Sequence, residues 1–160
     1  MVKTLVLVAT HVLALAAGFA LGVYTLPILI APAAPTAAEV AAEVAAQPQE
    51  RRFTGTFRRE LKDSDALHWG EGTVTVGRRS VTLAGDLAPG PDYKLYLSPQ
   101  FVETEADFVR LKPQMVRVGD VKTFRNFVVP VPDSVDPARY TTVIVWCESF
   151  GQFITAARYR

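Results

Sequence analysis

The pattern of apolar and charged positions divides the chain into three parts. From Leu5 to Ala31 no acidic or basic side chain interrupts the apolar sequence apart from His11. At a rise of about 1.5 Å per residue, this stretch would span roughly 40 Å as a helix, and a hydrocarbon core is about 30 Å thick. Residues 1–31 are therefore predicted to form one transmembrane anchor.

A cleaved signal sequence is the alternative for residues 1–31, because Ala31 and Ala33 offer small-residue cleavage sites. The apolar region of a signal sequence is normally about 7–15 residues long, which is shorter than the stretch found here. Lys3 lies on the short N-terminal side, and positive charge is retained in the cytoplasm. We therefore expect a single-pass membrane protein with a cytoplasmic N-terminus and an extracytoplasmic C-terminal domain, periplasmic or at the cell surface.

Residues 32–50 form an Ala/Pro-rich linker without the bulky apolar side chains that build a core. Within it, the stretch AAEVAAEVAA places Val40 and Val44 four residues apart among strong helix formers. It is compatible with a short helical stalk, while an alanine-rich tether is the simpler prediction.

Residues 51–160 show the period of strands. Alternation in residues 72–77 and 80–85, with two arginines between them, predicts a tight hairpin. The apolar run 140–148 predicts a central strand buried on both faces, and residues 153–159 are expected to pair with it. No window shows a long helical period, and Pro130 argues for an edge position. The pattern predicts an all-β domain, an antiparallel β-sandwich or a small barrel.

Charge changes this picture little. Residues 51–160 carry 16 Lys and Arg against 13 Asp and Glu, a net charge of +3, with the basic residues scattered among acids. Nucleic-acid binding proteins gather basic side chains in a patch or stripe. We therefore expect no nucleic-acid partner, and membrane lipid around the N-terminal helix as the first partner.

Four stretches carry a resemblance to a known family: GTF (55–57), ALHWGEGTVTV (66–76), PGPDYKLYLSP (89–99) and YTTVIVWCESFGQFITAA (140–157). In order and spacing they resemble the DM-thirteen family of small extracytoplasmic domains. The resemblance implies a β-sandwich-like fold and an electron-transfer or redox role centred on Cys147.

Cys147 is the only cysteine of the chain. Alternation along a strand places it on the face of Val143 and Val145, with Trp146 on the opposite face. A thiol buried among apolar side chains has a raised pKa and is inert, whereas a basic or partly exposed setting activates it. The sequence is compatible with both an inert, buried thiol and an activated one.

Counting ligands narrows the cofactor alternatives. A blue-copper centre needs two histidines beside the cysteine, but residues 51–160 contain only His68. Zinc sites and iron–sulfur clusters need about four ligands, and the C-x-x-C-H motif of covalent haem is absent. Non-covalent haem at Cys147 or His68 remains an alternative, as does a two-ligand metal site completed by Met115 or solvent.

The candidate redox or ligand site comprises Cys147, His68, Trp146 and Trp69. His68 precedes Gly70 and Gly72, where the backbone can approach closely. It would lie near Cys147 and lower the thiol pKa or ligate with it, or its imidazole would satisfy local backbone groups. Trp146 and Trp69 would serve as a redox relay or ligand wall, or pack in the core.

The apolar N-terminal stretch predicts a membrane-anchored module, and the resemblance implies an electron-transfer or redox role for it. We do not expect an enzyme in its own right, because Cys147 has neither a nucleophile elbow nor a helix after it. The alternative is a non-catalytic ligand- or protein-binding β-sandwich with Cys147 as a packed core residue. A protein redox partner, or a homodimer joined through Cys147, would supply the second sulfur that a single thiol lacks.

Overall fold

The computed structural model describes residues 1–160, apart from the side chain of Glu50. Its helices and strands occur in this order: α1 (Val2–Ile30), α2 (Ala37–Ala45), η1 (Gln49–Arg51), β1 (Phe53–Phe57), β2 (Gly70–Val76), β3 (Ser80–Leu87), β4 (Tyr93–Ser98), α3 (Glu105–Leu111), η2 (Lys112–Gln114), β5 (Val116–Val121), β6 (Arg125–Pro130), η3 (Pro137–Arg139), β7 (Thr142–Cys147) and β8 (Gln152–Arg158).

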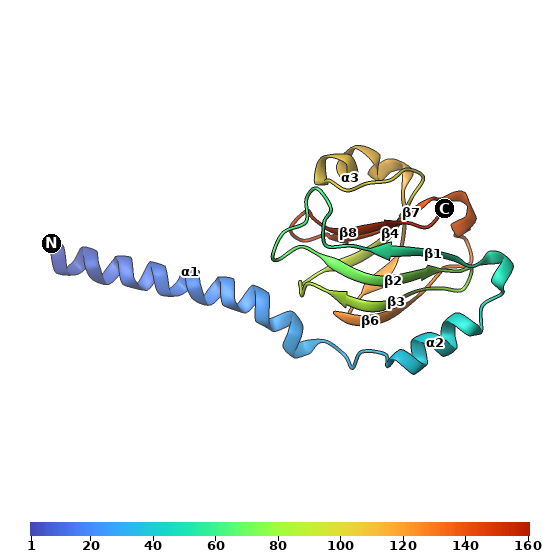
Figure 1. The fold of residues 1–160 in the computed structure, drawn as a ribbon. Helices are drawn as coiled ribbons and strands as arrows, with labels where there is room; N and C mark the ends of the chain where they lie inside the picture. The colour runs from blue at the N-terminus through green and yellow to red at the C-terminus, as the bar shows by residue number, and fades with distance from the viewer.

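Two antiparallel sheets of four strands each pack face to face (Figure 1). One sheet has the order β1-β2-β3-β6 and the other β5-β4-β7-β8. In the part of the chain that the structure describes, the sheets do not close into a barrel. The predicted β-sandwich is therefore confirmed and the barrel alternative is not.

The hairpin between β2 and β3 follows its sequence pattern. Gly77 donates its N–H to the carbonyl of Ser80 at 3.0 Å, so the two arginines form the predicted two-residue connection. Alternate side chains such as Val74, Val76 and Leu83 are fully buried between the sheets. Strand β6 ends at Pro130 on the edge of its sheet, as the missing proline N–H requires.

Strand β7 is the predicted central strand, and all six of its residues are buried. It pairs with β4 on one side and with β8 on the other. Val143, Val145 and Cys147 point into the core between the sheets, whereas Ile144 and Trp146 belong to a second apolar cluster on the outer face. The parity predicted from the sequence is confirmed.

Helix α3 covers that outer face, and the sequence pattern did not predict it. Its seven residues are too few to show a helical period. Thr104 caps the helix by accepting a hydrogen bond from the N–H of Asp107 at 3.1 Å. Phe108 stacks on Trp146 with ring centroids 3.9 Å apart and an interplanar angle of 9°. This stack fixes α3 to the sheet.

Of the two alternatives for residues 32–50, the structure shows the helix. Thr36 and Glu39 form a capping box at the start of α2, which satisfies two N–H groups that lack helical partners. Val40 is 3% exposed, and Gln47 donates a hydrogen bond to the hydroxyl of Ser80 at 2.8 Å. Helix α2 therefore lies against the sheet of β3 and β6 (Figure 1) instead of hanging free.

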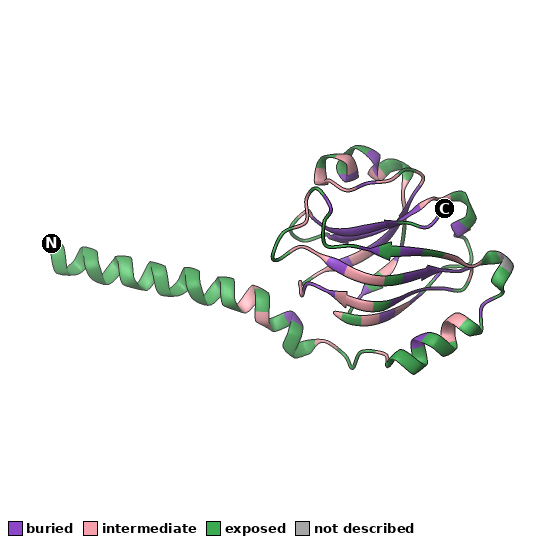
Figure 2. Cartoon of the chain, in the orientation of Figure 1, coloured by how far each residue is buried: buried purple, intermediate pink, exposed green. Residues whose placement is uncertain are grey.

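Helix α1 is long and apolar enough to cross a membrane. Figure 2 shows it exposed over most of its length, projecting from the sandwich. Towards its C-terminal end the domain begins to cover it, and Pro27 is buried.

Candidate functional site

Cys147 is the last residue of β7, and only 3% of its surface is exposed. Its neighbours across the sheet are Tyr93 of β4 and Gln152 of β8. Burial raises the pKa of the Cys147 thiol, and nearby backbone N–H groups such as that of Phe150 oppose this only in part. The thiol is therefore protonated at neutral pH.

Cys147 nevertheless lines a cavity of about 440 Å³, which we call the Cys147 cavity. The domain contributes parts of β4, β7 and β8, the turn between β7 and β8, and two other loops, with these residues: Leu67, His68, Pro89, Gly90, Pro91, Tyr93, Cys147, Phe150, Gln152 and Ile154. Helix α1 forms the remaining wall with Phe19, Ala20, Val23 and Tyr24. Most of these side chains are apolar, which is typical of small-molecule sites.

The structure places His68 in the same cavity as Cys147. The imidazole Nδ1 lies 2.9 Å from a carboxylate oxygen of Asp65. The other carboxylate oxygen accepts hydrogen bonds from the N–H groups of Leu67 and His68 at 2.7 and 2.8 Å. Asp65 thus fixes the orientation of the imidazole, and the hydrogen bond with His68 lowers the Asp65 pKa.

One of the alternatives raised for His68 was that it lowers the pKa of the Cys147 thiol. Pairing with a charged His68 would lower the thiol pKa, but burial moves the pKa of Cys147 upward. The charged partner of the imidazole is Asp65. His68 and Cys147 therefore share a cavity without forming a thiolate–imidazolium pair.

The two tryptophans of the predicted site do not line the Cys147 cavity. Trp146 lies on the opposite face of β7 under Phe108, because successive side chains of a strand alternate. The guanidinium of Arg59 lies over the Trp69 ring, with its central carbon Cζ 3.3 Å from the ring centroid. The structure groups Cys147 with His68 and places each indole in a different environment.

Other residues of the cavity were not selected from the sequence. Tyr93 packs in the core, and it also lines the cavity directly across the sheet from Cys147. Its hydroxyl donates to the carbonyl of Ala88 at 2.9 Å. The motif PGPDY, which contains Pro89, Pro91 and Tyr93, was the signal that could have found them.

Two glycines behave as the sequence predicted. A Cβ on Gly70 would lie 2.5 Å from Thr155 of β8, and one on Gly72 would lie 2.4 Å from the carbonyl oxygen of Ala84. Gly72 also has a φ of 122°, which side chains rarely adopt. These close approaches position the strand that follows His68.

Metal ligands are few around the thiol. Among the described residues, no group of three or more His, Cys, Asp or Glu side chains is arranged to hold a metal ion. Met115 packs against the cluster of Trp146 and Phe108, on the outer face of the sheet. Because Cys147 faces the inner side, Met115 cannot complete a metal site with it.

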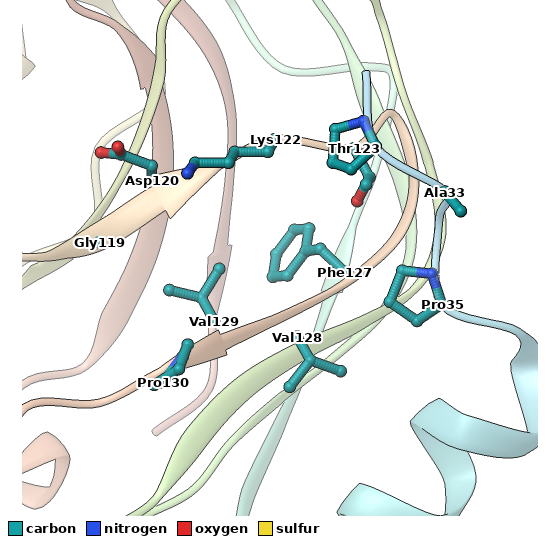
Figure 3. Close-up of a pocket in the computed structure, with 11 residues that line it drawn as sticks. Ala33, Pro35, Gly119, Asp120, Lys122, Thr123, Phe127, Val128, Val129 and Pro130 are labelled. Atoms are coloured by element: carbon teal, nitrogen blue, oxygen red, sulfur yellow. The ribbon is translucent and has the colours of Figure 1, made fainter. Parts of the chain in front are cut away.

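A second hollow, of about 530 Å³, lies where β5 and β6 form the open side of the sandwich. Figure 3 shows Phe127 and Val129 of β6 facing it, Asp120 and Lys122 at its rim, and Pro35 of the linker alongside. It contains none of the site residues predicted from the sequence.

Fold and site together define a small antiparallel β-sandwich that holds one buried thiol in an apolar cavity and is joined to a long apolar helix. Residues 57–159 match the family described as Electron transfer DM13. The chain belongs to this family, so the resemblance noted from the sequence is confirmed. No curated protein and no solved structure matches the chain.

Proposed function

We propose that this protein is a membrane-anchored, extracytoplasmic module with an electron-transfer or redox role centred on Cys147. The family description supports the redox role. The observation that carries the assignment to this residue is that Cys147 and His68, the only cysteine and the only histidine of residues 51–160, line one cavity.

The geometry limits how the thiol can react. A disulfide requires two Cα atoms within about 7 Å, but Cys147 lies in a central strand between β4 and β8. Its side chain is 3% exposed, so a second chain would have to bring an equally buried Cys147 to it, and the burial of both thiols argues against a covalent homodimer. A partner small enough for the cavity, or one that exchanges single electrons, fits the site better.

Voltammetry of the full chain in detergent tests the proposal. Wild-type protein is expected to give a redox wave that Cys147→Ser abolishes and that His68→Gln shifts, since both groups line the cavity. A visible absorption spectrum of the same preparations shows whether haem or a coloured metal accompanies the wave. A wave that persists unchanged in Cys147→Ser would refute the central role of the thiol.

The second candidate is a non-catalytic binding module with Cys147 as a packed core residue. The 3% exposure of Cys147 and its raised pKa favour it. Labelling with N-ethylmaleimide separates the candidates. A redox thiol reacts in the folded protein through its cavity, whereas a packed thiol reacts only after denaturation and gives no redox wave.

A further inference from the structure

An unbroken run of exposed residues in α1 has the length of a bilayer core. Residues 2–21 are all exposed, and at about 1.5 Å per residue these 20 or so residues span roughly 30 Å. From Gly22 onward the domain covers one side of the helix, where Pro27 is buried, while Leu26 and residues 28–30 stay exposed on the other side. If residues 2–21 fill the hydrocarbon, the membrane surface lies close to Gly22.

The Cys147 cavity lies at the same height along α1. Its helical wall comprises Phe19, Ala20, Val23 and Tyr24, which bracket that boundary. The cavity is therefore at the membrane surface, at the end of the sandwich nearest the lipid.

Two of the three exposed large apolar side chains of the domain lie at this end. Outside α1, the described residues include three exposed large apolar side chains: Leu67, Val109 and Phe150, which are 55%, 63% and 51% exposed. Leu67 and Phe150 both line the cavity, while Val109 lies on α3. Scattered apolar side chains are ordinary on a surface, but these two line one cavity together with an apolar helix, and we call them its apolar rim.

The polar groups of the cavity are few. Its volume of about 440 Å³ falls within the usual range for small-molecule sites. His68 uses Nδ1 for Asp65 and presents its other ring nitrogen, Nε2, as a hydrogen-bonding group. Tyr24 and Gln152 add a hydroxyl and an amide. The cavity thus offers apolar walls and a small number of hydrogen-bonding groups to a ring-sized molecule.

We propose that the Cys147 cavity binds an amphipathic molecule dissolved in the bilayer, with a flat polar ring and a hydrocarbon tail, the chemical class of the quinones. The ligand enters between α1 and the rim formed by Leu67 and Phe150, and this end of the sandwich rests on the outer membrane surface. The inference rests on the proposed membrane anchoring and names a ligand class for the proposed redox site.

The first test locates the rim. The full chain is placed in phosphatidylcholine vesicles that contain lipid with brominated acyl chains, which quench nearby tryptophan fluorescence. Leu67→Trp and Phe150→Trp are expected to add fluorescence that these lipids quench, and the matched Val109→Trp to add fluorescence that they do not. Equal quenching at all three positions would overturn the placement at the membrane.

The second test measures binding in the same vesicles with decylubiquinone, whose fully substituted ring does not readily add to a thiol. At ten times its Kd, the ligand is expected to slow N-ethylmaleimide labelling of Cys147 about tenfold. Leu67→Ser and Phe150→Ser should weaken this protection, whereas Val109→Ser should leave it intact.

A second readout does not require the thiol to react. A ligand that binds only the folded state raises the unfolding temperature by mass action, so decylubiquinone should raise it for wild type and for Val109→Ser. If decylubiquinone changes neither the labelling rate of Cys147 nor the unfolding temperature, the ligand proposal fails. The voltammetric test of Cys147 does not depend on this ligand, so the proposed redox role is tested separately.

Discussion

Burial sets the chemistry of three ionisable side chains: Tyr93 and Cys147 line the candidate site, and Tyr159 lies at the other end of the sheet. It raises the pKa of Tyr93, Tyr159 and the Cys147 thiol, because each loses solvation of its charged form. All three are neutral at physiological pH. The site is therefore apolar at its base, and Asp65 and His68 supply the charge and the hydrogen bonds at one side.

The raised tyrosine pKa values predict a loss of stability in alkali. A group whose pKa is higher in the folded state stabilises the fold below its unfolded pKa, and this contribution is lost as pH rises. Each buried tyrosine should cost about 1.4 kcal/mol of unfolding free energy by pH 11, one unit above the unfolded pKa of about 10. Urea unfolding between pH 7 and pH 11 measures this loss.

Tyr93→Phe gives the control. At pH 7 it loses the hydrogen bond to Ala88, so wild type should be more stable by about 1 kcal/mol. Above pH 10, ionisation of Tyr93 in the unfolded state destabilises the wild-type fold, and the variant lacks this group. The difference in unfolding free energy between the two proteins should therefore shrink or reverse. Parallel pH profiles for the two proteins would contradict the assignment.

Among the elements, β7 separates two environments. Its inner face carries Cys147 towards the cavity, and its outer face carries Trp146 under α3. The short helix α3 has little intrinsic stability, because isolated helices of this length do not form in water. Packing of Phe108 on Trp146 is what retains it.

Phe108→Ala should therefore lower the unfolding free energy by about 3–5 kcal/mol, the usual cost of removing a buried phenylalanine. The near-ultraviolet circular dichroism of the stacked rings should be lost as well. Val109→Ala is the matched control, since its exposed side chain on the same helix should cost no more than about 0.5 kcal/mol. Equal effects of the two substitutions would show that the stack does not hold α3.

Helix α2 shows how a segment with no core of its own gains structure. The capping box starts the helix, and burial of Val40 and Gln47 against the sandwich retains it. The segment between α1 and the domain is thereby shortened and attached to the sheet. This limits how far the sandwich can move from the end of α1.

The molecule as a whole places a sandwich beside the end of an apolar helix, and Lys3 before that helix predicts a cytoplasmic N-terminus with the sandwich on the other side of the membrane. In a bacterial host, alkaline phosphatase fused after Arg160 should be active, whereas green fluorescent protein fused there should be dark. The same reporters before Met1 should give the opposite result. Extraction with alkaline carbonate should leave the chain in the membrane. The mass of the purified chain should show that residues 1–31 are still attached.

A mature chain that begins at residue 32 or 34 would instead identify a cleaved signal sequence. Phe19 and Tyr24 would then be absent from the Cys147 cavity, which would lose its helical wall. Topology and site are therefore tested by the same preparation.

Much of this architecture follows from local patterns in the sequence. Alternation predicted the hairpin of β2 and β3, the buried strand β7 and the opposite faces of Cys147 and Trp146, because a period of two depends only on neighbouring residues. Length and apolarity predicted α1. The same local patterns did not predict α3, which shows no period, or the packing of α2, whose contacts lie in another part of the chain.

Only tertiary structure could show the Cys147 cavity. Its walls come from α1, from the loops before β2 and β4, and from the hairpin of β7 and β8. Strand order and helix docking bring these segments together, and both depend on contacts between residues far apart in sequence. The sequence therefore established which face of β7 carries the thiol, and long-range packing established that this face meets His68, an apolar cavity and the end of the long apolar helix.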